Sequence, residues 1–266
     1  MHPTLHLGPW TLSSYTLLYG LALLAAGSFS FARLYRGGME ASAAGWTVLF
    51  TIWAGFAGAM GLFAMVGTLL HWIGSGVWAW QRSNGYGPGL ACGVGMALLC
   101  LRRYRVPLGY GMDRIIVGIP LGQAIGRVGC LMAGCCAGQI TDSWLALTLP
   151  DRNGAWLPRY PARIIACAAN LTIFATLLLV DRWSQRRKRA GRRGLFDGGI
   201  LWGYLGLYAL KRFCTDFIRA DAQHAWGPLS TMQYAMAGLF VVAAVALAVG
   251  LRRKSSSSLA ARPPRD

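Results

Sequence analysis

An arginine lies in the middle of an apolar stretch near the centre of the chain. Arg127 falls within residues 122–138, which are otherwise glycine, alanine, cysteine and larger apolar residues, with one glutamine, Gln123. If this stretch spans a bilayer, a charge near its middle costs at least about 2.5 kcal/mol on insertion, so the guanidinium is expected to face a protein interior. A guanidinium in such a place binds an anion, because its planar fork of donors matches phosphate and carboxylate oxygens.

A second set of polar side chains lies on one face of a later apolar segment. Tyr208, Arg212, Asp216 and Arg219 follow one another at helical spacing. Arg212 and Arg127 each lie about 20 Å of helical rise from the expected cytoplasmic end of their segment, so we expect them at similar depth. One carboxylate among three arginines leaves the set positive, which favours a phosphate ligand. For Arg219 alone, we favour an ordinary place at the interfacial end of the helix.

The elements that must hold these residues are membrane helices. Hydrophobic residues make up 55% of the 266 residues and charged residues 13%, with a mean hydropathy of +0.42, which is typical of a polytopic membrane protein. We predict an all-α membrane protein with seven transmembrane helices, most of them near the 20 or so residues that a span requires. The seven segments are residues 13–32, 45–72, 87–101, 112–133, 162–180, 199–217 and 232–251.

The strong positive charge follows this topology. The chain holds 26 Lys and Arg against 9 Asp and Glu, a net charge of +17, which by itself would suggest nucleic-acid binding. However, 17 of the 26 basic residues follow the first, third, fifth and seventh segments. The positive-inside rule therefore predicts an outside N-terminus, a cytoplasmic C-terminus and no nucleic-acid partner. We expect residues 1–251 to form a single polytopic membrane domain and residues 252–266 a disordered cytoplasmic tail.

The largest loop, residues 139–160, is expected on the outer side. Asn153-Gly154 between apolar runs favours a hairpin, a small arm between the fourth and fifth helices. A plain loop held at the membrane surface by Trp144 and Trp156 is the alternative.

The cysteines and glycines of residues 122–138 are predicted to serve packing. Small residues recur at every fourth position from Gly122 to Gly138, a seam that lets neighbouring helices approach closely. We expect Cys130, Cys135 and Cys136 to act as small apolar residues. Adjacent cysteines on one helix point apart, which disfavours a disulfide, and the four histidines are scattered, so no metal site is predicted.

Several motifs together resemble one family, over most of the chain from about residue 7 to residue 221. They are Tyr19-Gly20-Leu21, Gly126-Arg127-Val128-Gly129, Arg159-Tyr160-Pro161, and Tyr208 with Arg212-Phe213, Asp216-Phe217 and Arg219. This set is similar to that of the prolipoprotein diacylglyceryl transferases of bacterial inner membranes. The resemblance implies transfer of the diacylglyceryl group of phosphatidylglycerol to the lipobox cysteine thiol of a preprolipoprotein signal peptide. It also implies release of glycerol phosphate and no metal or organic cofactor.

The resemblance assigns roles to residues of this chain. Arg127 and Arg212 correspond to the two signature arginines and are the expected catalytic residues, with Tyr86 in the place of the histidine of a His-Gly-Gly element. The residues expected to bind substrate are Gly126, Gly129, Tyr19, Tyr208, Asp216 and Arg219. We also expect the two glycines to allow close helix packing.

The chain departs from the family pattern just after Arg127 and again at residues 163–166. Cys130, Ala133 and Cys135 stand where the family has Asn, Asn and Glu, and residues 163–166 replace a Gln-Leu-Tyr-Glu sequence. Two alternatives therefore remain beside the transferase. One is a non-catalytic relative that binds lipid or signal peptide. The other is an anion transporter that uses the same arginines. Transporters commonly contain inverted repeats, and this sequence shows no such repeat.

Overall fold

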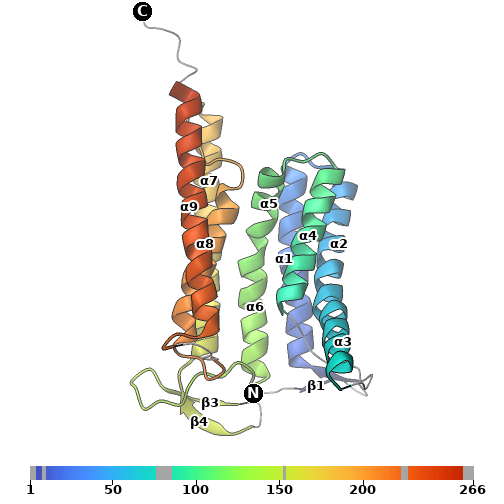
Figure 1. The fold of residues 1–266 in the computed structure, drawn as a ribbon, viewed down its shortest axis with the longest axis vertical. Coiled ribbons are helices and arrows are strands. Elements are labelled where there is room, and N and C mark those ends of the chain that lie inside the picture. Colours follow the sequence, from blue (N-terminus) through green and yellow to red (C-terminus); the bar gives the residue numbers. More distant parts are fainter. Residues whose placement is uncertain (1–3, 8–9, 76–85, 152–153, 223–226, 260–266) are drawn as a thin grey trace, which may run out of the picture. The chain divides into compact units, whose positions relative to one another are not determined.

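The computed structural model describes residues 4–7, 10–75, 86–151, 154–222 and 227–259, and these are mostly helical (Figure 1). The chain divides into two compact units, one of residues 27–115 and one of residues 1–26 with 116–266. Each unit is described by itself below.

The unit of residues 27–115 is built from apolar helices in contact through glycines. It contains the second part of α1 (Ser14–Arg36), α2 (Ala41–Ala57), α3 (Phe63–Ser75), α4 (Tyr86–Arg103) and α5 (Leu108–Ile116). A π-helical turn, Gly58–Leu62, joins α2 to α3, so the long segment expected at 45–72 is one helical rod with a change of register. A Cβ atom at Gly89 would lie 2.8 Å from the Gly55 carbonyl oxygen, which shows how closely α2 and α4 approach.

The other unit holds both arginines. It comprises the first part of α1, α6 (Gly118–Met132), α7 (Ala162–Arg189), α8 (Gly199–Asp216) and α9 (Thr231–Leu259). Helix α6 packs against α7, and α8 contacts both α7 and α9 (Figure 1). A Cβ atom at Gly122 would lie 2.9 Å from both the Ala22 carbonyl oxygen and the Ala26 side chain, so α6 and α1 meet at the predicted glycine seam.

The hairpin predicted between the fourth and fifth expected segments is confirmed. Strands β3 (Leu147–Pro150) and β4 (Trp156–Arg159) pair antiparallel, with Leu147 opposite Arg159. Gly154 has a φ of +83°, the left-handed conformation that the turn requires, whereas Asn153 lies outside the described residues. A second hairpin, β1 (Thr4–Leu7) with β2 (Trp10–Ser13), was not predicted.

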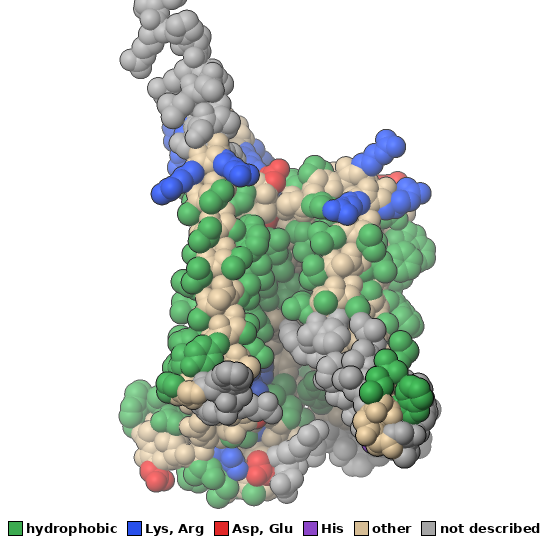
Figure 2. All heavy atoms as spheres, in the orientation of Figure 1, with side chains coloured by type: hydrophobic (Ala, Val, Ile, Leu, Met, Phe, Trp, Pro, Cys, Tyr) green, Lys and Arg blue, Asp and Glu red, His purple; other side chains and the backbone are tan. Residues whose placement is uncertain are grey.

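Five helical segments in the described residues are long and apolar enough to cross a membrane. They are Ser14–Arg36, Ala41–Gly61, Leu108–Met132, Ala162–Arg189 and Thr231–Arg253. The prediction of a helical membrane protein is therefore confirmed in its coarse form. Helices α4 and α8 lie where the third and sixth segments were expected, and α8 carries three charged residues within its length. The last turn of α7 is basic, and Arg252 and Arg253 lie in the C-terminal third of α9; blue side chains gather in this region of the surface (Figure 2).

Two helix ends differ from the expected segments. Helix α6 ends at Met132, followed by Gly134 with a φ of +73° and Cys136 with a φ of +56°. The predicted seam is therefore wrong beyond Met132, because Gly134 and Gly138 lie outside the helix. At the other end of the chain, α9 continues to Leu259 instead of ending at residue 251, and residues 260–266 lie outside the described part.

Candidate functional site

The two arginines that the sequence singled out come together in the structure. Arg127 on α6 and Arg212 on α8 are close enough to interact electrostatically, and Lys211 is close to both. Three cations that converge from two helices repel one another, so the place favours an anion.

Asp216 is the buried carboxylate of this cluster. It is 2% exposed, and its Oδ1 atom lies 3.1 Å from Nη2 of Arg212 and 4.0 Å from Nε of Arg219. The Ser230 hydroxyl donates a hydrogen bond to its Oδ2 atom. Because ion pairs buried in this way fix geometry as well as charge, Asp216 orients the Arg212 guanidinium from one side.

Ser230 reaches Asp216 from a helix cap that the sequence analysis did not identify. Its Oγ accepts the Gln233 backbone N–H at 3.1 Å, and the Gln233 Oε1 atom accepts the Ser230 N–H at 2.8 Å. This reciprocal pair is a capping box at the start of α9. The Ser-x-x-Gln spacing was the available signal, and the cap ties α9 to the cluster on α8.

One terminal nitrogen of the Arg212 guanidinium is buried without a hydrogen-bond partner among the described residues. This atom is Nη1, while Nη2 faces Asp216. A buried polar group without a partner costs about 1–3 kcal/mol, and more when it is charged. The unused donor of a cation therefore marks a position where an anionic ligand would be stabilised.

Lys211 is a second residue that the sequence analysis missed. Its Nζ atom donates to Oδ1 of Asn170 on α7 at 2.8 Å and lies 4.4 Å from the centre of the Tyr208 ring. Tyr208 thus contacts the cluster through its ring, as a cation–π partner. The available signal was a lysine next to an arginine inside an apolar helix.

Arg219 lies beyond the end of α8 and is joined to the segment after α6. It forms an ion pair with Asp221, with Nε 2.8 Å from Oδ1. The backbone N–H of Ala220 donates to the Ala137 carbonyl at 3.1 Å, and that of Gln139 donates to the Ile218 carbonyl at 2.9 Å. Residues 137–139 and 218–220 therefore run side by side, which places Cys136 beside Arg219.

Arg163, noted in the sequence only as a departure from the family pattern, is a structural centre of this region. It is 2% exposed, and its guanidinium donates to three backbone carbonyls, those of Cys135 (2.6 Å), Gly134 (2.5 Å) and Pro150 (3.2 Å). One side chain thus holds both the turn after α6 and the end of β3.

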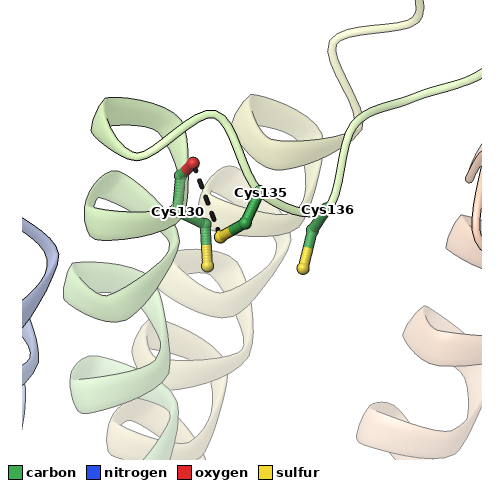
Figure 3. Close-up of side chains that lie close together, drawn as sticks. All are labelled: Cys130, Cys135 and Cys136. Atoms are coloured by element: carbon green, nitrogen blue, oxygen red, sulfur yellow. Dashed lines mark hydrogen bonds between the residues drawn. The ribbon is translucent and has the colours of Figure 1, made fainter. Parts of the chain in front are cut away.

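The turn after α6 brings three thiols together. The sulfurs of Cys130, Cys135 and Cys136 all lie within 4.8 Å of one another (Figure 3), and the Cys135 thiol is 3.8 Å from the Cys130 carbonyl oxygen. The expectation that Cys135 and Cys136 share a helix is wrong, because α6 ends before them. Hydrogen bonds from the other two thiols, with Arg219 and Arg127 nearby, lower the pKa of the Cys136 thiol.

Gly126 and Gly129, both predicted to allow close helix packing, differ in how closely other atoms approach them. A Cβ atom at Gly129 would lie 3.3 Å from the Leu18 side chain, which confirms close packing there. A Cβ atom at Gly126 would have none of the described atoms within 4 Å, so the packing role predicted for Gly126 is wrong.

Tyr19 and Tyr86 are the two remaining predicted residues. Tyr19 on α1 stacks on Tyr15 with ring centres 6.0 Å apart and is 43% exposed. Tyr86 is the first residue of α4, in the other unit, and its side chain is outside the described part. The arrangement that remains is a cationic cluster with one buried carboxylate and an adjacent group of thiols.

Comparisons with known proteins show the family of this chain. The family model for prolipoprotein diacylglyceryl transferase matches residues 3–249. A phosphatidylglycerol–prolipoprotein diacylglyceryl transferase 2 of Clostridium perfringens is 30% identical over 151 residues, 56% of this chain and 55% of that protein. A transferase of the same name from Mycobacterium leprae is 28% identical over 252 residues, 82% of this chain and 70% of that protein. The chain spans about half the length of several curated relatives that it matches, and it belongs to the prolipoprotein diacylglyceryl transferase family.

Proposed function

We propose that this protein transfers the diacylglyceryl group of phosphatidylglycerol to the lipobox cysteine thiol of preprolipoproteins. The names of its relatives support the substrate. The observation that carries the proposal is the convergence of Arg127 and Arg212, with one buried Arg212 donor unused. A phosphodiester headgroup is the anion that a membrane supplies at such a place.

The reaction fits a cationic cluster. The substrate thiol gives its proton to water, and its sulfur attacks the glyceryl carbon that bears the phosphate oxygen, so an S–C bond forms and a C–O bond breaks. The electron pair of the broken bond stays on the phosphate oxygen, and glycerol phosphate leaves. Arg127 and Arg212 stabilise the negative charge that grows there, since they are fixed in place before the reaction begins.

The other predicted residues support binding in this proposal. Asp216 orients Arg212 and keeps the cluster from excess positive charge, and Arg219 assists from the outer end of α8. Tyr208 holds Lys211 through its ring. Tyr19, Gly126 and Gly129 are assigned to substrate binding, and Tyr86 to catalysis, by the resemblance alone.

We also propose seven spans, with α4 and α8 added to the five candidates, an outside N-terminus and a location in the bacterial inner membrane. The basic residues around the ends of α7 and α9 support a cytoplasmic position for those ends. The arginine cluster then lies toward the outer side, where a signal peptide presents its lipobox cysteine.

The test uses purified protein in detergent with phosphatidylglycerol and a lipobox peptide. The expected product is a thioether-linked diacylglyceryl peptide together with glycerol phosphate, detected by mass spectrometry. A peptide in which serine replaces the lipobox cysteine is the control. If the wild-type protein binds the peptide but forms no product, the protein is a non-catalytic member of the family and the proposed transfer is wrong.

A further inference from the structure

Three thiols that lie within 4.8 Å of one another are arranged as metal ligands are. Thiolates bound to one zinc ion at about 2.3 Å sit roughly 3.8 Å apart, so only small side-chain rotations are needed to close on an ion. All three cysteines are free and partly exposed. We propose that Cys130, Cys135 and Cys136 bind a zinc ion, whose open fourth position takes the thiol of the incoming peptide. This assignment replaces the expectation that these cysteines only fill space.

The backbone conformation of the turn after α6 supports metal binding by the three cysteines. The backbone is left-handed at Gly134 and Cys136. In Figure 3 the Cys135 side chain points toward Cys130, and the Cys136 sulfur lies to one side of the other two. For a residue other than glycine, a positive φ costs free energy and is found where the surrounding structure enforces it. Arg163 supplies that constraint by holding the carbonyls of Gly134 and Cys135.

Ligand chemistry favours zinc. Thiolates select soft or borderline ions, and zinc with Cys ligands is tetrahedral. Among the described residues, no histidine, aspartate, glutamate or further cysteine adds a fourth ligand atom to the group. Three protein ligands with one open position are the arrangement of reactive zinc sites, whereas structural sites are closed by four.

The surrounding charges suit a zinc ion with three thiolates, which carries one net negative charge. Arg219 and Arg127 lie close to Cys136, and Arg163 lies close to Cys135. These cations stabilise the complex, and they also place it at the edge of the cluster proposed to bind the lipid phosphate.

The open position gives the site a role in catalysis, a step that rests on the proposed function. A thiol that coordinates zinc is deprotonated, and its proton passes to a water molecule. The bound sulfur attacks the glyceryl carbon, the C–O bond breaks with its electron pair on the phosphate oxygen, and the thioether product leaves the ion. Zinc is neither oxidised nor reduced.

The first experiment measures the metal alone. Wild-type protein, a Cys130→Ser/Cys135→Ser/Cys136→Ser variant and a matched Cys92→Ser/Cys167→Ser/Cys214→Ser variant are purified from cells grown with zinc. We expect about one zinc per chain in the wild type and in the matched variant, and very little in the cluster variant. Equal zinc in all three proteins, or a disulfide between two of the cluster cysteines, would overturn the proposal.

The second experiment tests the open position by a readout that does not need transfer. Wild-type protein is loaded with Co²⁺, whose absorption reports thiolate ligands, and is titrated with the lipobox peptide. A changed spectrum with the cysteine peptide, and none with its serine counterpart, is the expected result. If neither peptide changes the spectrum, the thiol-binding role is wrong.

Transfer assays then separate this inference from the proposed function. Removing zinc from the wild-type protein with a chelator should slow transfer about 30-fold, since a free thiol is only a few per cent ionised at pH 7, and adding zinc back should restore it. Transfer at the full rate without zinc would overturn the catalytic role and leave the proposed function intact. No transfer in any sample, with the cobalt response present, would refute the proposed function and support the metal site.

Discussion

Replacement of Arg163 tests whether one buried side chain organises the outer end of this unit. In an Arg163→Met protein the three backbone carbonyls of Gly134, Cys135 and Pro150 lose their donors. The methionine fills similar space, so the change removes hydrogen bonds more than packing. Arg163→Lys keeps the charge but offers no planar fork to three separate oxygens.

The size of the effect follows from the three contacts. A hydrogen bond from a charged group contributes about 1.5–3 kcal/mol, and contacts that share one side chain do not add fully. We therefore expect Arg163→Met to lower the free energy of unfolding by roughly 3–5 kcal/mol, and Arg163→Lys by about 2 kcal/mol. Arg187→Met is the matched control, because Arg187 donates to the Arg193 carbonyl at an exposed site and should cost under about 0.5 kcal/mol.

The assay is denaturant unfolding of the purified proteins in one detergent, followed by circular dichroism. The zinc content of each folded protein is measured in parallel, because a loosened turn should also weaken binding by the three thiols. If Arg163→Met unfolds at the same denaturant concentration as Arg187→Met, the carbonyl contacts do not hold this region and the reasoning is refuted.

Three further predictions concern the cluster and the topology. Arg127→Lys and Arg212→Lys proteins, matched for membrane level, should each transfer labelled lipid about 10²–10³ times more slowly, because an ammonium cannot hold two phosphate oxygens; near-normal rates in both would contradict the phosphate-binding role. Asp216→Asn should lower the free energy of unfolding by about 3 kcal/mol in the denaturant assay, since it leaves buried Arg212 without a counter-charge, and an unchanged midpoint would refute that pairing. In intact cells, an impermeant thiol reagent should label a cysteine placed at Asn153 but not one placed at Lys188, and the reverse pattern would overturn the orientation.

The parts of the site that the sequence predicted are those carried by helical spacing. Arg212 and Asp216 are four residues apart on a continuous helix, so their ion pair follows from the period alone. The prediction that Arg127 lies near Arg212 rested on a similar helical rise from the start of each apolar segment to its arginine. Both inferences depend on the regular geometry of a helix, in which the spacing of two residues along the sequence fixes their separation in space.

The parts that the sequence could not supply depend on where regular geometry stops. The end of α6 at Met132 is set by left-handed residues, and nothing in a run of small residues fixes that point in advance. Once the chain turns there, Cys135 and Cys136 no longer diverge. Arg163 was equally hidden, because its three partners are backbone carbonyls, and sequence does not show which carbonyls a distant turn presents.

The substitutions beside the arginines form a consistent set when the thiols are taken as ligands. Cys130 and Cys135 stand at two positions where the family resemblance expects Asn and Glu, and the structure brings both sulfurs to Cys136. Random loss of polar residues from a disused site would give apolar residues of varied size. Three convergent thiols, a buried arginine that fixes their turn and a conformation rare outside glycine point instead to one group of ligands exchanged for another around the same cationic cluster.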